Sequence, residues 1–280
     1  DRLVNHRRYS PFVMTDEPPV NTDVLPFDPI FSTASLPAPV RRLETAAKKF
    51  GGFSPFYFSI LKKEKPAVAH AHYGPIGAAA LKSTDAAGVP LVVSFYGIDA
   101  SAMLDNPATL KSYIPMFSRA AAVSVLSEHM AGRLADAGCP GEKIRVHHLA
   151  VDTDKYTPAP SQGSSDGSFR VVSVGRLVPK KGMDRLISAF SALIGEIDNP
   201  QLHIYGGGPL EGELKELVAG KNLSGHVFIH GHQRRETALE AVKHADLFAL
   251  FSVTGPDGDM EGTPTVLIEA GALGVPSVST

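Results

Sequence analysis

Short apolar runs alternate with segments of helical spacing along most of this chain. In chain order the runs are 66–72, 91–95, 121–125, 144–146, 170–174, 202–205, 227–229 and 246–251. Each run has the length of a buried strand, and the helical segment between two runs can supply the crossover that parallel strands need. The sequence therefore predicts an α/β protein built on parallel sheets.

The segments outside these runs are predicted from their spacing and composition. Residues 12–14 form a short strand candidate, and 16–40, rich in Pro, Asp and Thr, are predicted to be an irregular loop with turns. Helices are predicted at 40–50, 56–65, from 74 to 87, from about 107, from Ser127 as N-cap to 137, and at 183–197, 210–221 and 235–244.

A polar stretch divides the alternation into two series. Residues 159–168 read Ala-Pro-Ser-Gln-Gly-Ser-Ser-Asp-Gly-Ser, which is typical of a flexible linker. We predict Rossmann-like domains at 1–158 and 169–280, consistent with a length of 280 residues. Because ligands of such sheets bind outside the carboxyl ends of the strands, loops of both domains are expected to line a cleft.

Composition excludes several classes of protein. A net charge of −2 without a long basic run gives no electrostatic basis for nucleic-acid binding. The single cysteine, Cys139, excludes an internal disulfide and fits a reducing compartment. No apolar run approaches the ~18 residues of a membrane span, and no signal peptide is recognisable. We expect a cytoplasmic protein, and weak attachment to the inner membrane surface stays compatible with the sequence.

The stretch 260–276 combines a predicted helix start with two carboxylates, and a buried strand is predicted after the helix, ending at 278–280. Thr263 is predicted as N-cap and Pro264 as the first helical residue, with Glu261 before the helix and Glu269 within it. A helix start suits a phosphate, and carboxylates accept hydrogen bonds from the hydroxyls of a hexose or a ribose. A capped helix with two solvated acids is the alternative.

This stretch resembles the signature of the retaining glycosyltransferases of family 4, which have the GT-B fold. The resemblance rests on Glu261-Gly262-x-Pro264, Glu269-Ala270 and Gly274-x-Pro276. It implies that Glu261 binds hydroxyls of the donor sugar and that Glu269 binds the ribose. It also places the donor diphosphate near the helix start, at Gly262, Thr263, Pro264, Thr265 and Val266. Family members usually extend beyond both ends of this sequence, so we expect a fragment with an incomplete C-terminal domain.

The stretch 175–182, Gly-Arg-Leu-Val-Pro-Lys-Lys-Gly, follows a predicted strand and precedes a helix. The resemblance assigns Arg176 and Lys181 to the diphosphate, and with Glu261 they form the predicted catalytic set. Fixed cations there would stabilise the negative charge that grows on a leaving diphosphate. An exposed basic turn is the alternative.

Two further loops complete the predicted donor site. Gly207 and Gly208 follow one strand, where glycines let backbone approach a ligand closely. Gly231 and His232 follow the next strand, in the region where the family holds the nucleotide base. We assign no proton transfer to His232, which is equally compatible with an ordinary loop residue.

On the acceptor side, the candidates are His72, Tyr96 and Asp99. His72 ends a predicted strand and is either a cleft residue or a packed strand-end histidine. Many family members have His where Tyr96 stands, and tyrosine does not readily take a proton at neutral pH. Asp99 is expected either to bind an acceptor hydroxyl or to cap the following turn.

The sequence Asp257-Gly258-Asp259 reads like the Asp-x-Asp of metal-dependent glycosyltransferases, which belongs to a different fold. We interpret it as a solvated acidic loop near the acceptor side. Because Arg176 and Lys181 already supply positive charge, we predict neither a metal nor a cofactor.

The predicted function is transfer of a sugar from a nucleoside-diphosphate sugar to a saccharide or lipid-linked acceptor, with retention at the anomeric carbon. The resemblance suggests polysaccharide or envelope glycan synthesis. Two alternatives stay open. A GT-B sugar-nucleotide epimerase would release free nucleotide without a second sugar, and a non-catalytic nucleotide-sugar-binding subunit would agree with Tyr96.

Overall fold

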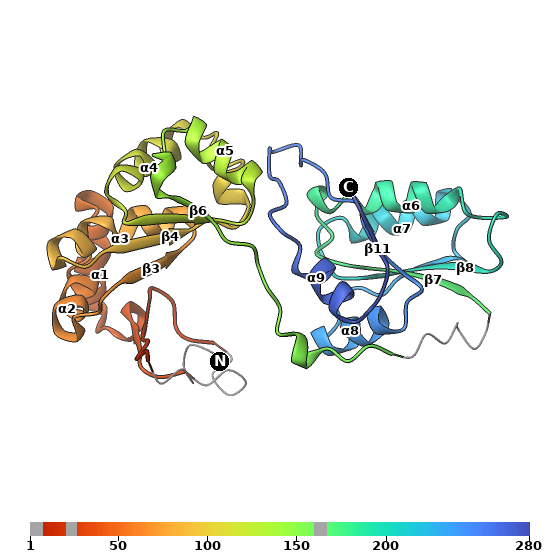
Figure 1. Ribbon diagram of the computed structural model, residues 1–280, viewed down its shortest axis with the longest axis horizontal. Coiled ribbons are helices and arrows are strands. Elements are labelled where there is room, and N and C mark those ends of the chain that lie inside the picture. The colour runs from red at the N-terminus through yellow and green to blue at the C-terminus, as the bar shows by residue number, and fades with distance from the viewer. Residues whose placement is uncertain (1–7, 21–26, 160–166) are drawn as a thin grey trace. The chain divides into compact units, whose positions relative to one another are not determined.

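The computed structural model describes residues 8–20, 27–159 and 167–280. Contacts divide the chain into two compact units, which are described separately (Figure 1). The first consists of Asp1–Phe95, Pro107–Val125 and Leu134–Arg145, and the second of Tyr96–Asn106, Leu126–Arg133 and Val146–Thr280. Residues 160–166 of the predicted linker lie outside the described residues, and the predicted domain boundaries stay predictions.

The first unit is built on a four-stranded sheet with the order β3-β4-β5-β6. Its strands are β3 (Ala69–His72), β4 (Leu91–Ser94), β5 (Ala122–Val125) and β6 (Ile144–Val146). The pairs β3–β4 and β4–β5 are parallel, as the alternation predicts. Val93 and Val123 are fully buried on one face of the sheet because alternate residues of a strand share a face.

In the N-terminal half of the chain the structure has helices α1 (Ala38–Ala46), α2 (Pro55–Glu64), α3 (Gly74–Ala87), α4 (Pro107–Arg119) and α5 (Glu128–Asp136). Helix α3 packs directly on β3 and β4, and Phe95, Tyr113 and Phe117 form an aromatic cluster that is completely buried. Ser127 caps α5 as predicted, since its hydroxyl accepts a hydrogen bond from Met130 N (3.3 Å).

The prediction of an irregular loop over 16–40 is wrong in part. Strand β2 (Ile30–Ser32) pairs in parallel with β1 (Val13–Thr15), and a 3₁₀ turn follows at Thr33–Ser35. The rings of Phe12 and Phe31 meet edge to face with centroids 5.7 Å apart. A strand of three residues is too short to show a period of two in the sequence.

The second unit is built on a five-stranded sheet with the order β11-β10-β7-β8-β9, in which every adjacent pair is parallel. Its strands are β7 (Phe169–Val174), β8 (Pro200–Tyr205), β9 (Val227–Ile229), β10 (Leu247–Leu250) and β11 (Ser277–Ser279). The four helices that connect them are α6 (Met183–Ser191), α7 (Glu211–Gly220), α8 (Arg235–Lys243) and α9 (Thr265–Ala272).

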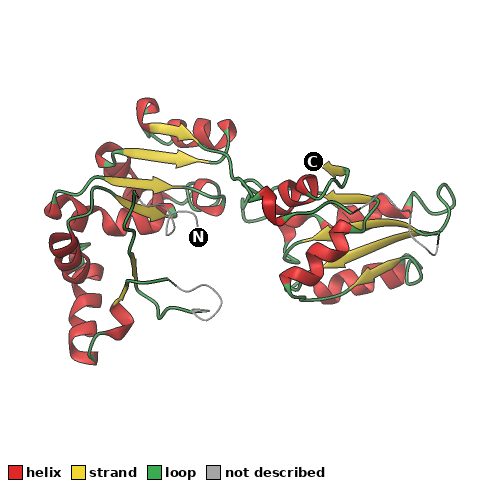
Figure 2. Ribbon diagram, turned by 60° about the horizontal axis from the view of Figure 1, so that its bottom comes forward, coloured by secondary structure: helices red, strands yellow, loops and turns green. Residues whose placement is uncertain are grey.

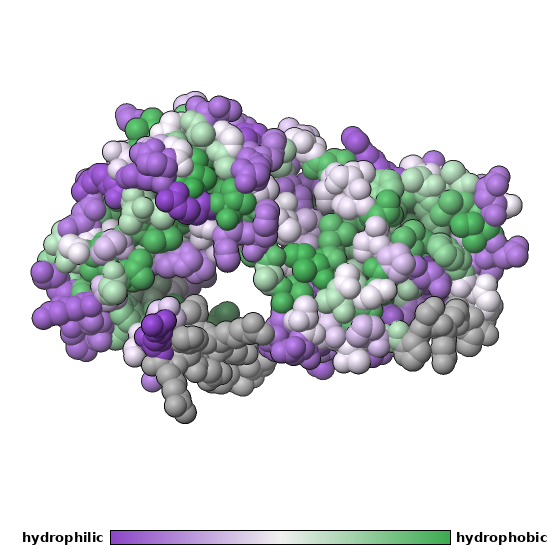
Figure 3. Space-filling model, viewed as in Figure 1, coloured by the Kyte–Doolittle hydropathy of each residue, from purple (hydrophilic) through white to green (hydrophobic). Residues whose placement is uncertain are grey.

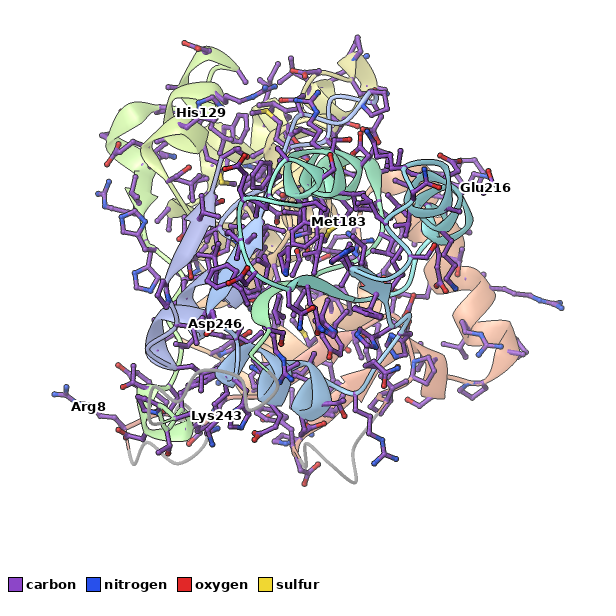
Figure 4. The ribbon with its side chains drawn as sticks, turned by 90° about the vertical axis from the view of Figure 1, so that its right-hand side faces the viewer. Arg8, His129, Met183, Glu216, Lys243 and Asp246 are labelled. Carbon is purple, nitrogen blue, oxygen red and sulfur yellow. The ribbon has the colours of Figure 1, made fainter. Side chains whose placement is uncertain are left out.

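Helices lie on both faces of this second sheet (Figure 2). Helices α6 and α7 lie on one side and α8 and α9 on the other (Figure 1). The core between these layers includes Leu202, Ile204 and Phe248, all fully buried. Met183, at the start of α6, lies in the interior, whereas Glu216 on α7 points outward (Figure 4). The arrangement is the doubly wound parallel sheet that the alternation predicts.

Two predicted helix boundaries in the second unit, and the predicted burial of its last strand, are wrong. Helix α6 ends at Ser191 rather than 197, because the chain turns and Gly195 takes a positive φ of 89°. Helix α9 begins at Thr265, and Pro264, with ψ at 110°, is its extended N-cap in place of Thr263. Strand β11, predicted to be buried, is exposed because it lies at the edge of the sheet.

Candidate functional site

The loop between β7 and α6, residues 175–182, contains both predicted diphosphate ligands. Arg176 is exposed, and among the described residues it has neither an ion pair nor a side-chain hydrogen bond. The side chain of Lys181 is 12% exposed, and its Cδ and Cε lie 3.5 Å from the position that a Cβ on Gly175 would take. The loop thus presents one free guanidinium and one largely buried ammonium.

Lys181 contacts Glu261, which lies in the long loop between β10 and α9. Lys181 Nζ lies 2.5 Å from Glu261 Oε2, and the Glu261 side chain is 19% exposed. Glu261 Oε2 is buried, and the contact is an ion pair without hydrogen-bond geometry. The structure therefore brings together two of the three predicted catalytic residues, and the Glu261 carboxylate retains its capacity to accept hydrogen bonds from another group.

The neighbouring lysine forms a second ion pair between the same two loops. Lys180 Nζ lies 3.1 Å from Oδ1 and 3.0 Å from Oδ2 of Asp259. The two side chains are 10% and 16% exposed. The interpretation of 257–259 as a solvated acidic loop is therefore wrong for Asp259, because its carboxylate is largely buried in an ion pair with Lys180. Lys180 was not predicted, although a basic pair in one loop and acids at alternate positions in the other were visible in the sequence.

The glycine-rich loops after β7, β8 and β9 are joined through their backbones. Leu177 N donates to Gly207 O, and Gly206 N donates to Gly231 O, both at 2.9 Å. A Cβ on Gly208 would come within 2.5 Å of Leu177 O, so a side chain there would separate the loops. These glycines serve close loop packing, and the predicted contact of Gly207, Gly208 and Gly231 with donor stays a prediction.

His232 follows Gly231 and is exposed. Its Cβ lies 3.3 Å from the position that a Cβ on Gly207 would take. The structure thus places the predicted base-binding segment beside the glycine loop after β8.

Glu269 on α9 is 8% exposed and belongs to a three-residue network. Tyr156 Oη donates to Glu269 Oε1 at 3.0 Å, Arg235 Nη2 also donates to Oε1, and Arg235 Nη2 lies 2.8 Å from Tyr156 Oη. The hydrogen bond with Tyr156, together with the charge of Glu269, raises the pKa of Arg235. Sequence reasoning missed Tyr156 and Arg235, because neither belongs to a motif of the predicted donor site.

The segment that leads into α9 contains the other predicted donor residues. Gly262, Thr263 and Pro264 are half-buried, whereas Thr265 is exposed as the first helical residue. The half-buried Val266 side chain packs against the core.

The predicted acceptor-side residues lie on elements of the N-terminal half of the chain. His72 ends β3 with its ring 4.4 Å from that of His70, and burial lowers the pKa of His72, which favours the neutral ring. Asp99 is fully buried, and its Oδ1 accepts hydrogen bonds from Tyr96 N (3.0 Å) and Gly97 N (2.9 Å). Asp99 thus caps this turn, and acceptor binding by these residues stays a prediction.

The described residues contain no group of three or more His, Cys, Asp or Glu side chains placed to hold a metal ion. Over the same ranges, none of the helices has the length and hydropathy that crossing a bilayer requires. Hydrophilic and hydrophobic residues are interspersed over the visible face (Figure 3).

Family models match nearly the whole chain. Residues 7–155 match the model for Glycosyltransferase Family 4, and residues 157–280 match the model for Glycosyl transferases group 1. The division between the two matches falls next to Tyr156.

Curated relatives carry glycosyltransferase names. The putative colanic acid biosynthesis glycosyltransferase WcaL of Escherichia coli K12 is 35% identical over 212 residues, which are 75% of this chain and 52% of the relative. A GDP-mannose-dependent phosphatidylinositol monomannoside mannosyltransferase of Mycobacterium tuberculosis is 32% identical over 165 residues, 56% of this chain and 43% of that protein. The chain thus spans about half the length of these relatives.

Solved structures share the fold. The crystal structure of Anabaena HepE in complex with UDP and glucose matches with a TM-score of 0.72 at 19% identity, over 96% of this chain and 72% of that one. The predicted GT-B fold, with two Rossmann-like domains, is thereby confirmed. Since a family model covers residues 7–155 of the 280, the chain belongs to glycosyltransferase family 4.

Proposed function

We propose that this chain transfers a sugar from a nucleoside-diphosphate sugar to a saccharide or lipid-linked acceptor, with retention at the anomeric carbon. The observation that carries the proposal is the contact between Lys181 and Glu261, 2.5 Å apart, in loops at the carboxyl ends of β7 and β10. This cation, which would bind the diphosphate, and this carboxylate, which would bind sugar hydroxyls, thus lie where parallel sheets bind ligands.

Arg176 and Lys181 would hold the diphosphate of the donor. Guanidinium and ammonium groups bind phosphate oxygens through charge-assisted hydrogen bonds. As the bond between the anomeric carbon and the phosphate oxygen breaks, negative charge grows on the diphosphate, and fixed cations stabilise that state more than the bound donor.

The acceptor hydroxyl would attack the same face of the sugar from which the diphosphate departs. The leaving phosphate oxygen takes the proton of the acceptor hydroxyl, and the new bond joins the acceptor oxygen to the anomeric carbon. This route needs no side chain as general base and gives retention. Glu261 would orient the sugar through its hydroxyls.

Glu269 would bind the ribose. Tyr156 and Arg235 both reach Oε1 of Glu269, so that a ribose hydroxyl would bind Oε2. Their bonds fix the direction of the carboxylate before the donor arrives, which reduces the ordering that binding requires.

The relatives suggest donors and acceptors to test. One relative is named as GDP-mannose-dependent, and a structural neighbour holds UDP and glucose. We propose a role in polysaccharide or glycolipid synthesis in the cytoplasm at the inner membrane surface, without a metal, a further cofactor or a nucleic-acid partner.

A transfer assay tests this proposal. The chain is incubated with GDP-mannose, UDP-glucose or ADP-glucose and a panel of alkyl glycosides, and NMR reads the anomeric configuration of the product. We expect transfer with retention that is lost in Lys181→Gln and Glu261→Gln and kept in Lys221→Gln, a change at an exposed lysine. Free nucleotide and an epimerised sugar without acceptor would instead indicate an epimerase, and binding without turnover a non-catalytic subunit.

A further inference from the structure

We infer that Lys180 and Asp259 are positioning residues, which hold the loop 251–264 against the loop 175–182 and so keep Glu261 at the donor sugar. The inference rests on the proposed function, because it assigns a task to a pair of residues beside the donor site. Neither residue is assigned to the donor itself.

The ion pair between these residues is bidentate and largely buried. Lys180 Nζ lies 3.1 Å from one oxygen of Asp259 and 3.0 Å from the other, with 10% and 16% of the two side chains exposed. Removing one partner of a buried pair leaves an uncompensated charge, so such a pair strongly favours the arrangement in which it can form. The pair therefore specifies how the two loops meet.

The backbone holds the same two loops together. Val253 N donates to Lys180 O at 2.9 Å, and a Cβ on Gly182 would lie 1.8 Å from Phe251 O. Lys180 is thus fixed through its main chain and its side chain, and the start of the long loop is pressed against the start of α6.

The long loop is also fixed internally around Asp259. Gly255 N donates to Asp259 O at 2.8 Å, and Asp259 N donates to Asp257 Oδ1 at 3.1 Å. A turn therefore closes between Gly255 and Asp259, and the first acid of the Asp-x-Asp sequence serves this turn. The carboxylate of the second acid, Asp259, forms the ion pair with Lys180.

Glu261 follows Asp259 by two residues, and Lys181 follows Lys180 by one. The pairs Lys180–Asp259 and Lys181–Glu261 add two ion pairs to the backbone contact between the loops. Between the two acids, the backbone N–H of residue 260 donates to Ser101 Oγ at 3.2 Å. With Asp259 held on Lys180 two residues before it, the Glu261 carboxylate has fewer directions in which it can point.

The pair also separates the charges of the site. With both Asp259 oxygens on the Lys180 ammonium, Asp259 does not compete with Glu261 for Lys181. It also adds little repulsion toward a diphosphate, since its charge is neutralised at about 3 Å.

Calorimetric titration of donor and free nucleotide tests the inference. The donor that the wild-type chain binds and the nucleoside diphosphate of the same base are titrated into wild type, Lys180→Met, Lys180→Arg and Asp259→Asn. If the pair directs Glu261 to the sugar, Lys180→Met and Asp259→Asn weaken donor binding by about 10-fold or more, as for a lost hydrogen bond to a charged group. In Asp259→Asn, which leaves no unpaired carboxylate at the site, binding of the free nucleoside diphosphate does not weaken. Lys180→Arg retains donor binding.

The double variant Lys180→Met/Asp259→Asn adds a test of coupling. Because the two residues act as one unit, its loss of donor affinity is expected to be less than the product of the single losses. Unfolding by urea shows which variants are folded. If Lys180→Met does not fold, the comparison of the isosteric variant Asp259→Asn with the variant Lys180→Arg tests the inference.

Three results would overturn the inference. Equal losses of donor and free-nucleotide binding in Asp259→Asn would indicate a general structural effect. Unchanged donor binding in folded variants would show that the pair does not position Glu261. A wild-type chain that binds neither ligand would contradict the proposed function, and the inference with it. In the first two cases wild-type donor binding leaves the proposed function standing.

Discussion

Arg235 illustrates how an exposed side chain can organise a buried one. Its side chain is 61% exposed, but Nη2 contacts both the Tyr156 hydroxyl and Glu269 Oε1. Without Arg235, the nearly buried Glu269 carboxylate would lose its ion pair, and Oε1 would keep the hydrogen bond from Tyr156. The orientation of the proposed ribose ligand therefore depends on a residue outside the family signature.

We expect Arg235→Ala to lower the free energy of unfolding by about 1 kcal/mol, since the pair is partly screened by solvent. Arg234→Ala is the matched control, because Arg234 is the preceding exposed arginine at the start of α8. Urea unfolding measures both. Equal effects of the two substitutions would show that Arg235 does not support Glu269.

Gly182 is required at the junction between the two lysines and α6. Its φ is 57°, and a Cβ there would lie 1.8 Å from Phe251 O. We expect Gly182→Ala to destabilise the chain by about 2–4 kcal/mol, from the left-handed backbone and the clash together. Urea unfolding measures the change.

Gly195→Ala isolates the backbone part of that effect. Gly195 has a φ of 89°, and no atom lies within 4 Å of the position that a Cβ on it would take, so we expect a loss of about 1–2 kcal/mol. A loss at Gly182 no larger than at Gly195 would contradict the close approach of the two loops.

At the scale of elements, the close contact between α3 and its sheet limits the size of the side chains on the packed face of the helix. A Cβ on Gly77 would meet Val93 Cγ1 at 2.7 Å and Met116 Sδ at 2.8 Å. We expect Gly77→Ala to destabilise the first unit by about 1–3 kcal/mol through overpacking, although alanine is the better helix former.

Gly132→Ala in α5 should have the opposite sign. A Cβ on Gly132 has no neighbour within 4 Å, so the substitution is expected to stabilise by about 0.5–1 kcal/mol through helix propensity alone. Thermal unfolding of the two variants compares them, and the same sign for both would contradict the described packing of α3.

Elements with a strong apolar signal could be predicted from the sequence, and those held by tertiary contacts could not. The eight predicted runs became strands because apolar segments of this length must be buried. Strand β2 was missed because three residues show no periodicity. A tertiary contact, between the rings of Phe12 and Phe31, is found there instead. The start of α9 was misplaced because Pro264 is compatible with both the N-cap and the first helical position.

At the scale of the whole molecule, the chain forms two compact units with their own cores. Units of this kind often unfold separately. We predict two transitions in calorimetry, and donor is expected to raise the temperature of the second unit's transition. At a donor concentration of 100 times the dissociation constant, the free energy of unfolding of the second unit increases by about 2.7 kcal/mol. An equal shift of both transitions would show that donor binding does not depend on the second unit alone.

The candidate site was predictable only where its residues belong to motifs at the ends of predicted strands. Loops at strand ends place Arg176, Lys181 and Glu261 near one another by topology, and the structure brings the last two into contact. The contacts of Glu269 with Tyr156 and of Asp259 with Lys180 could not be predicted, since no motif marks these residues as partners. Such pairs depend on how loops meet in space.

The most direct measurement is calorimetric binding of UDP-, GDP- and ADP-sugars to the wild-type chain, to Lys181→Gln and to Lys221→Gln. The account predicts that one nucleotide class binds, that Lys181→Gln weakens this binding by about 10- to 100-fold, as for a lost charged hydrogen bond, and that the exposed Lys221→Gln binds like wild type. Equal binding by all three chains, or none by a folded wild type, would contradict the assignment of the second unit as the donor site.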